Sequence, residues 1–172
     1  MKKKTFFSLI GLLVLVCTGC ERSSYNSNGK VELYLINSFS KINNSWGIDE
    51  CSVITKSDPL IEYSDFLSYN PKDYTFELSS SAKETVKNLD HSVFGIAFAI
   101  KANESIIYTG YFWPSYSSAS CDWIVIDPLS TLIGNKIQVT LGYPGLVQGQ
   151  NIPDKRNDVR ILRIFKRDNK LE

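Results

Sequence analysis

Hydrophobic and polar residues alternate in several short stretches of the chain, and a period of two is typical of β-strands. In the clearest stretch, Tyr74, Phe76 and Leu78 fall on one face while Thr75 and Glu77 fall on the other. Other stretches are short apolar runs bounded by Asn, Gly, Ser or Pro, which also predict strands. The strands expected from these patterns cover residues 31–36, 52–55, 59–63, 74–78, 93–102, 106–113, 123–126 and 137–141.

The segment 93–102 differs from the others because it is apolar on both faces, with large residues alternating with Gly and Ala. A strand of this kind is buried on both sides, so we expect it at the centre of the sheet. Residues 101–104 predict a tight connection, after which 106–113 return as a hairpin partner. Pro114 ends that strand.

Two segments predict short helices. Ser81 and Glu84 fit the S-x-x-E capping box, which predicts a helix to about Asp90. Residues 127–134 begin with Asp-Pro and end with Gly, a combination typical of a capped short helix. A single helical turn is expected at 64–67, with Ser and Asp at its start.

The C-terminal segment 159–167, VRILRIFKR, predicts a third helix, with a strand as the alternative. Asn157 or Asp158 would cap the helix, and the basic residues at its end complement the helix dipole. The preceding charged segment 153–158 is interpreted as a solvated helix start, or as a salt-bridged contact point for a partner.

These elements predict one α+β domain over 31–172, with a mostly antiparallel sheet and two or three short helices. A chain of 172 residues with 43% hydrophobic residues is large enough to bury a single core. Residues 37–51 are rich in Asn, Ser and Gly and are expected to form a loop. We find no internal repeat and no second domain.

The N-terminus has the layout of an export signal over residues 1–19: three lysines and then a short apolar run. Cys17-Thr18-Gly19-Cys20 resembles the lipobox of bacterial lipoproteins, although Cys17 stands where leucine is usual. The resemblance implies that Cys20 is acylated and becomes the first residue of the mature protein. The alternative is an ordinary cleaved signal peptide. Residues 20–30 are polar and aperiodic, which favours a flexible tether.

The interpretation of the N-terminus as an export signal also predicts the net charge and the location of the mature protein. Loss of the three signal lysines leaves 16 basic and 18 acidic residues, so the mature chain has a net charge near −2. No basic run remains that could bind phosphates, and nucleic acid is not an expected partner. Glu21 follows the lipobox, and the absence of Asp there favours the outer membrane, facing the periplasm or the cell surface.

Cys51 and Cys121 are the remaining cysteines, and in an oxidising compartment they are expected to form a disulfide. Two separate buried thiols, or one reactive thiol, are the alternatives. Neither Cys51 nor Cys121 belongs to a C-x-x-C motif, a spacing that occurs only at Cys17–Cys20 in the predicted lipobox. The chain has one histidine, His91, so we expect no metal site and no cofactor.

Catalytic motifs are missing from the sequence. The serines at 115–120 lack a G-x-S-x-G frame, and no Gly-rich phosphate loop occurs. A dyad of Cys121 and His91 has no local support, so we do not expect an enzyme. The aromatic-rich stretch 106–127 offers a different candidate: Tyr111, Trp113 and Tyr116 could form an exposed binding surface, with core packing as the alternative for most aromatics there.

The segments 61–70, 74–89, 94–126, 141–144 and 153–167 resemble, in order and content, a group of small uncharacterised bacterial lipoproteins. That resemblance implies no activity. Residues 60–126 are also similar in layout to the periplasmic head domain of the accessory membrane protein of the Sec export machinery. The similarity does not extend to that family's transmembrane segments, so it implies only a ferredoxin-like arrangement.

The sequence thus predicts a lipid-anchored envelope protein with a non-catalytic head that binds another envelope protein or an exported polypeptide. The alternative is a glycan-binding lipoprotein that uses Tyr111, Trp113 and Tyr116 as a stacking platform. A third hypothesis is an enzyme based on Cys121 or a carboxylate pair. It would need a deep pocket lined by titratable side chains with shifted pKa values.

Overall fold

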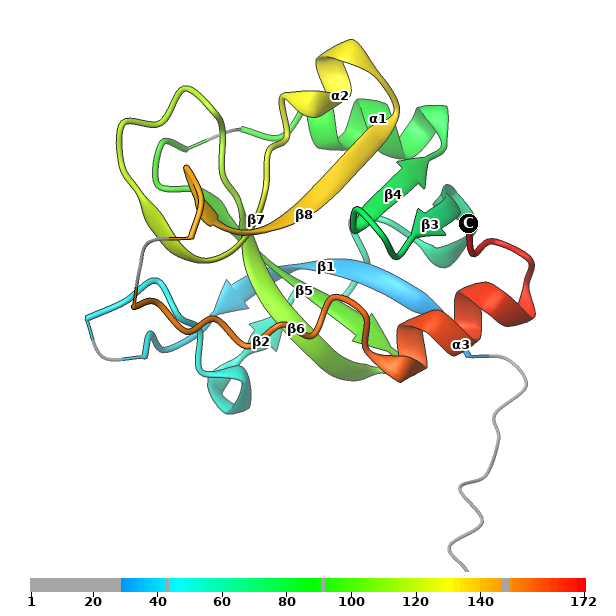
Figure 1. Cartoon of the computed structure of the whole chain (residues 1–172), viewed down its shortest axis with the longest axis horizontal. Coiled ribbons are helices and arrows are strands. Elements are labelled where there is room, and N and C mark those ends of the chain that lie inside the picture. The colour runs from blue at the N-terminus through cyan, green and yellow to red at the C-terminus, as the bar shows by residue number, and fades with distance from the viewer. Residues whose placement is uncertain (1–28, 43, 91, 147–148) are drawn as a thin grey trace, which may run out of the picture.

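The computed structural model describes residues 29–42, 44–90, 92–146 and 149–172 (Figure 1). The predicted signal peptide, the predicted acylation site Cys20 and all of the predicted tether before Gly29 lie outside the described residues, as does His91. Gly29 is the first described residue, and it is buried where the chain enters β1.

The described residues form one eight-stranded sheet in the order β2-β1-β5-β6-β7-β8-β4-β3. Every neighbouring pair is antiparallel except β6 and β7, which are parallel. The predicted α+β class with a mostly antiparallel sheet is therefore confirmed, whereas the ferredoxin-like arrangement is not. The strands are β1 Val31–Ser38, β2 Ile54–Thr55, β3 Phe66–Asn70, β4 Thr75–Leu78, β5 Ile96–Ala102, β6 Ser105–Phe112, β7 Cys121–Ile126 and β8 Lys136–Tyr143.

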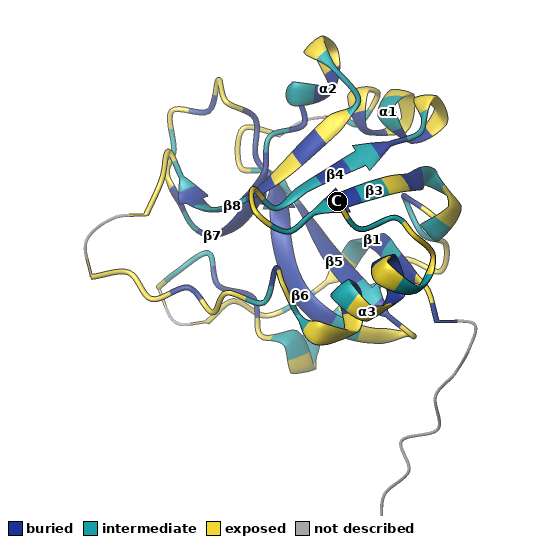
Figure 2. Ribbon diagram, turned by 45° about the vertical axis from the view of Figure 1, so that its right-hand side comes forward, coloured by how far each residue is buried: buried dark blue, intermediate teal, exposed yellow. Residues whose placement is uncertain are grey.

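The β5–β6 hairpin lies inside the sheet, as the two-sided apolar pattern predicted, and most of its residues are buried (Figure 2). Asn103 and Glu104 make the turn with positive φ angles of 52° and 67°, which suit a tight hairpin. Across the pair, Phe98 lies opposite Gly110. A Cβ on Gly110 would lie 2.6 Å from Phe98 Cζ, so glycine makes room for the aromatic ring.

Three α-helices lie around the described sheet: α1 Ser80–Lys87, α2 Ser130–Ile133 and α3 Val159–Arg167. In Figure 1, α1 and α2 lie together above β4 and β8, and α3 lies on the opposite side. The C-terminal segment is a helix, so its strand alternative is wrong. The Asp158 side chain caps it by accepting a 2.9 Å hydrogen bond from Arg160 N, and Ile161, Ile164 and Phe165 face the core.

The single helical turn expected at 64–67 is present as a short 3-10 turn at Tyr63–Asp65, but Phe66 and Leu67 already belong to strand β3. Phe66 and Tyr69 are fully buried and pair with β4, Tyr69 opposite Phe76. The neighbouring 59–63 segment is not a full strand, since Ile61 makes only an isolated bridge to β1. Tertiary burial of Phe66 and Tyr69 therefore ends the helical turn at Asp65 and places the following residues in a strand.

The cap of α1 is Ser79 rather than the predicted Ser81. Ser79 Oγ accepts a 3.1 Å hydrogen bond from Ala82 N, whereas Ser81 Oγ donates to Asp65 Oδ1. Glu84 pairs with Lys87 instead of reaching back to the helix start. The sequence thus located the helix correctly but misplaced its first turn by two residues.

We expect Ser79→Ala to lower the free energy of unfolding by about 1 kcal/mol, because the amide of Ala82 loses its acceptor. Ser80→Ala is the matched control, since Ser80 is exposed and its hydroxyl has no hydrogen bond in the described structure. Urea unfolding followed by circular dichroism measures both. Equal effects of the two substitutions would contradict the capping role of Ser79.

The charged segment 153–158 was expected to be solvated, but Arg156 within it is only 8% exposed. Its guanidinium donates to Val139 O at 3.0 Å and to both carboxylate oxygens of Asp154, and it lies 3.5 Å from the centre of the Tyr74 ring. The segment is therefore attached to the sheet through a buried cation, which charge patterning alone did not indicate.

Candidate functional site

Four connecting segments meet at one end of the molecule, on the left of Figure 1, and we call this region the loop end. The segments are 39–48, 88–95, 113–120 and 143–150, each taken without residues 43, 91, 147 and 148, which the structure does not describe. Side chains join them: Ser117 Oγ donates to Val93 O at 2.7 Å, and Tyr143 Oη donates to Ser115 O at 2.7 Å. The loop end is therefore an ordered surface within the described residues.

Residues 41–42 and 44–48 form the two sides of a small closed loop. Lys41 and Ile48 form an antiparallel bridge, Ile42 N donates to Gly47 O at 2.7 Å, and Asn44 adopts a positive φ of 51° that its short polar side chain tolerates. The loop is attached to the sheet by the amide of Trp46, which donates to Asp122 Oδ1 at 2.6 Å. This bond to a carboxylate fixes the position of the Trp46 ring.

The Trp46 ring joins the buried core to the surface. Its inner side packs against Trp113, with ring centroids 4.9 Å apart at 74°, and it stacks on Phe94 at 6.3 Å and 19°. Lys41 Nζ lies 3.5 Å from the ring centre. Phe94 is 58% exposed, so the aromatic cluster continues from the core to solvent.

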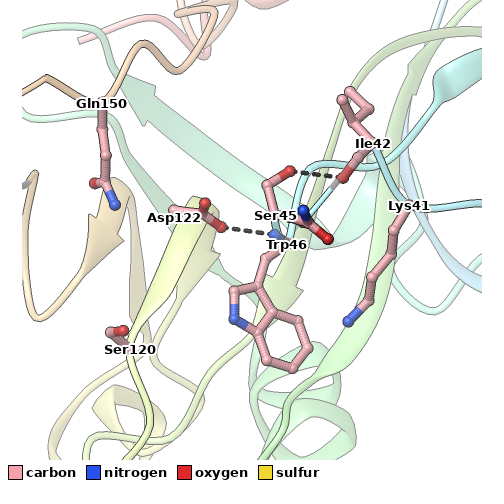
Figure 3. Close-up of a pocket in the computed structure, with 8 residues that line it drawn as sticks. Lys41, Ile42, Ser45, Trp46, Ser120, Asp122 and Gln150 are labelled. Carbon is pink, nitrogen blue, oxygen red and sulfur yellow. Dashed lines mark hydrogen bonds between the residues drawn. The ribbon is translucent and has the colours of Figure 1, made fainter.

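Beside Trp46 lies a polar surface pocket of about 590 Å³ (Figure 3). Lys41 makes no ion pair with any described residue, and the Trp46 indole nitrogen has no hydrogen bond among them. An ammonium group, a carboxylate, amides and hydroxyl groups line this pocket together with the aromatic ring of Trp46. Its lining residues are Lys41, Ile42, Asn44, Ser45, Trp46, Ser120, Asp122 and Gln150.

The predicted surface of Tyr111, Trp113 and Tyr116 is not formed. Tyr111 and Trp113 are 2% and 0% exposed, and only Tyr116, at 56%, reaches solvent. Trp113 Nε1 donates to Ala119 O at 3.2 Å. The Tyr111 hydroxyl is buried without a hydrogen-bond partner in the described structure, and burial raises its pKa well above the ordinary value. Core packing, the alternative interpretation, holds for both buried residues.

The predicted disulfide is not formed in the structure, where Cys51 and Cys121 are both free thiols. Cys51 is exposed on the 3-10 turn Glu50–Ser52, whereas Cys121 is 1% exposed at the start of β7. Two side chains in such different environments, one at the surface and one in the core, do not meet. Burial raises the pKa of the Cys121 thiol to about 12, so it is protonated and unreactive at neutral pH.

We expect a version of the chain that begins at Glu21 to titrate one thiol when folded and two in denaturant. Cys51 is accessible to a thiol reagent, whereas Cys121 reacts only after unfolding. The reagent 5,5′-dithiobis(2-nitrobenzoate) measures both, and Cys51→Ser should abolish the fast reaction. If no thiol reacts even in denaturant, the result would support the predicted disulfide between Cys51 and Cys121 and contradict two free thiols.

Metal-ligating side chains do not cluster in the part of the chain that the structure describes: no group of three or more His, Cys, Asp or Glu could hold an ion there. Among the described residues, no helix has both the length and the apolar character needed to cross a membrane.

Sequence reasoning missed Trp46, Lys41 and Asp122. Segment 37–51 was interpreted only as a connection, because it lacks periodicity. The available signal was a tryptophan within a polar Asn-Ser-rich loop, a position where no strand or helix pattern accounts for so large an aromatic side chain.

Comparisons with protein-family models, with curated proteins and with solved structures found no match to this chain.

Proposed function

We propose that this chain is a lipid-anchored envelope protein whose head is a non-catalytic binding module for another envelope protein or an exported polypeptide. The anchor is Cys20, and the location is the outer membrane, facing the periplasm or the cell surface. The observation that carries the binding role is the loop end, where ordered segments expose apolar side chains.

The exposed apolar residues of the loop end belong to all four of its segments. Ile42 is 46% exposed, Val93 47%, Phe94 58%, Tyr116 56% and Leu146 57%. Soluble domains scatter such residues singly, and a gathered set is typical of an interaction site. Aromatic residues are also enriched in the cores of protein interfaces. Phe94 and Tyr116 are therefore the expected anchors for a polypeptide partner.

The position of the loop end fits a tethered head. Gly29, the first described residue, accepts a 2.7 Å hydrogen bond from Arg167 in α3, and in Figure 1 α3 lies on the side away from the loop end. A tether of about ten residues reaches at most ~35 Å when extended. The loop end would then face away from the membrane that holds Cys20, toward partners in solution.

We expect Phe94→Ser to lose a partner that co-purifies with the wild-type protein from detergent-solubilised membranes. The matched control is Ile133→Ser, because Ile133 is 95% exposed on α2, outside the loop end. Quantitative mass spectrometry of the captured proteins measures the difference. If wild type captures nothing above background, or if both variants keep the partner, the loop end is not the binding surface.

We expect Cys20→Ala to abolish acylation and release the protein from the membrane fraction, because the thiol is the lipid acceptor. Two or more acyl chains are needed for stable anchoring, at about 0.8 kcal/mol for each buried methylene. Intact-protein mass spectrometry of fractionated cells measures the lipid. A wild-type mass without lipid would contradict the anchor and favour the ordinary signal peptide.

A second candidate function is glycan binding, and the pocket beside Trp46 favours it. An aromatic ring next to carboxylate, amide and hydroxyl groups is suited to a sugar, which presents C–H faces together with hydroxyls. Trp46, with Lys41 and Asp122, replaces the platform first predicted at Tyr111, Trp113 and Tyr116. Sugar addition should change tryptophan fluorescence in the wild type and not in Trp46→Leu.

A further inference from the structure

The two charges of the Trp46 pocket are satisfied to different degrees. Asp122 accepts a short hydrogen bond from the Trp46 amide, so the protein already supplies a donor to this carboxylate. Lys41 has no carboxylate partner among the described residues, and its Nζ rests on the Trp46 ring. A cation–π contact at an exposed site is worth only about 0.5–1 kcal/mol. The Lys41 ammonium group is therefore the main charge of the pocket that has no partner of opposite charge among the described residues.

Lys41 also covers the part of Trp46 that a flat ligand would use. Figure 3 shows its ammonium group beside the indole ring, at the end of a four-carbon side chain that starts on the pocket wall. The residue is exposed, so rotation of this side chain needs no change in the backbone. A ligand that stacks on Trp46 would displace Nζ from the ring, and it gains most if it offers Nζ a negative group in return.

We infer that the pocket binds a carboxylate-bearing sugar residue of an acidic glycan, with its ring on Trp46 and its carboxylate on Lys41. Hydroxyl groups of the sugar then donate to Asp122 and contact Ser120 and Gln150, which face the same cavity. This inference rests on glycan binding, the second of the proposed functions, and specifies its ligand class.

Other ligands match fewer of these groups. A neutral sugar would remove Lys41 from Trp46 without giving it an anion. A small inorganic anion would use Lys41 but would leave the aromatic ring and Asp122 without partners. A volume of about 590 Å³ is within the range of small-molecule sites and leaves room for more than one sugar ring.

The test compares acidic sugars with matched neutral forms, using tryptophan fluorescence of the lipid-free mature chain. The pairs are oligogalacturonate and its methyl ester, sialyllactose and lactose, and methyl glucuronide and methyl glucoside. Trp113 and Trp123 are 0% and 9% exposed, so a ligand-dependent change reports mainly on Trp46. At least one acidic member should bind about five- to tenfold more tightly than its neutral partner, and added salt should weaken it.

Lys41→Gln keeps the length of the side chain and removes the charge, so it should abolish the preference for the acidic member. Lys72→Gln is the control, because Lys72 is exposed in the β3–β4 turn, away from the pocket. Thermal unfolding confirms that both variants fold. An unchanged preference in Lys41→Gln would overturn the inference.

Two further outcomes distinguish a failure of the acidic-sugar inference from a failure of the glycan-binding proposal on which it rests. Equal binding of acidic and neutral members, still dependent on Trp46, would overturn the acidic specificity and leave glycan binding in place. No binding by any member would overturn both the inference and the glycan-binding proposal. The capture experiment with Phe94→Ser tests the polypeptide-binding proposal independently of either result.

Discussion

Phe165→Ala should lower the free energy of unfolding by about 4 kcal/mol, because it empties the centre of an aromatic cluster. Phe165 is fully buried, and its ring centroid lies 5.6 Å from Tyr63, 6.1 Å from Phe66 and 5.6 Å from Tyr69. These partners lie on β3 and the turn before it, so one side chain attaches α3 to that edge of the sheet. Equilibrium unfolding in urea measures the change.

Lys166→Ala is the matched control for this prediction. Lys166 is the next residue of the same helix and is exposed, so its truncation should change stability by less than about 0.5 kcal/mol. If the two substitutions have similar effects, α3 is not packed on β3 as the structure shows. Loss of binding at the loop end is not expected from either, since α3 lies away from it (Figure 1).

Arg156→Met should cost about 3 kcal/mol, although methionine has a similar volume. The substitution leaves Val139 O without its 3.0 Å donor and removes the stacking on Tyr74. An unsatisfied buried carbonyl costs about 1–3 kcal/mol, and a desolvated cation–π contact about 2 kcal/mol. The segment before α3 would then lose one of its attachments to the sheet, while the hydrogen bonds from Tyr69 Oη to Arg156 O and Asn157 Oδ1 remain. Urea unfolding and proteolysis of this segment measure the effect.

Arg160→Met is a close control for Arg156→Met, because both arginines pair with the aspartate two residues before them. The Arg156 side chain is 10% exposed, whereas that of Arg160 is 47% exposed. A surface pair contributes about 0–1 kcal/mol, so Arg160→Met should have a small effect. Comparable losses in the two variants would contradict the burial argument.

The stability difference between wild type and Arg156→Met should also depend on pH. Hydrogen bonding from Arg156 lowers the pKa of Asp154. A depressed folded-state pKa contributes stability above the unfolded-state value of about 3.9, and this is lost as pH falls through the folded-state pKa. The part of the difference due to the ion pair should therefore be present at pH 6 and diminish below pH 4. A difference that widens on acidification would contradict this assignment.

Local pattern predicted the parts of this fold that depend on neighbours in the chain. The two-sided apolar run at 96–102, its hairpin partner β6 and the alternation of β4 each imply their own burial, and all three are confirmed. The strand expected over 93–102 begins only at Ile96, and Val93 and Phe94 are exposed in the connection before it. The C-terminal helix is also confirmed, together with its cap at Asp158. In each case the period and the capping residue lie within about ten residues, so no distant contact was needed to recognise them.

The incorrect sequence predictions all concern side chains whose burial or exposure depends on residues that are distant in the chain. Phe66 and Tyr69 form a strand because β4 and α3 cover them, and the local Ser-Asp start signal does not reveal that cover. Tyr111 and Trp113 became core because Trp46 and Phe39 pack on them. Arg156 is buried because Tyr74, 82 positions earlier, lies beneath it. The local sequence around an aromatic or charged residue does not show whether another part of the fold packs over its side chain.

The sequence by itself determined the fold class, the central hairpin and the three helices, because short-range periodicity and capping are encoded locally. It also supplied the acylation and export hypothesis, which depends on the first twenty residues and lies outside the described structure. Only the tertiary structure decided the separation of the two thiols and the pocket of Lys41, Trp46 and Asp122. That pocket exists because a loop and the start of β7, some 76 positions apart, meet through one hydrogen bond, and no local pattern encodes such a meeting.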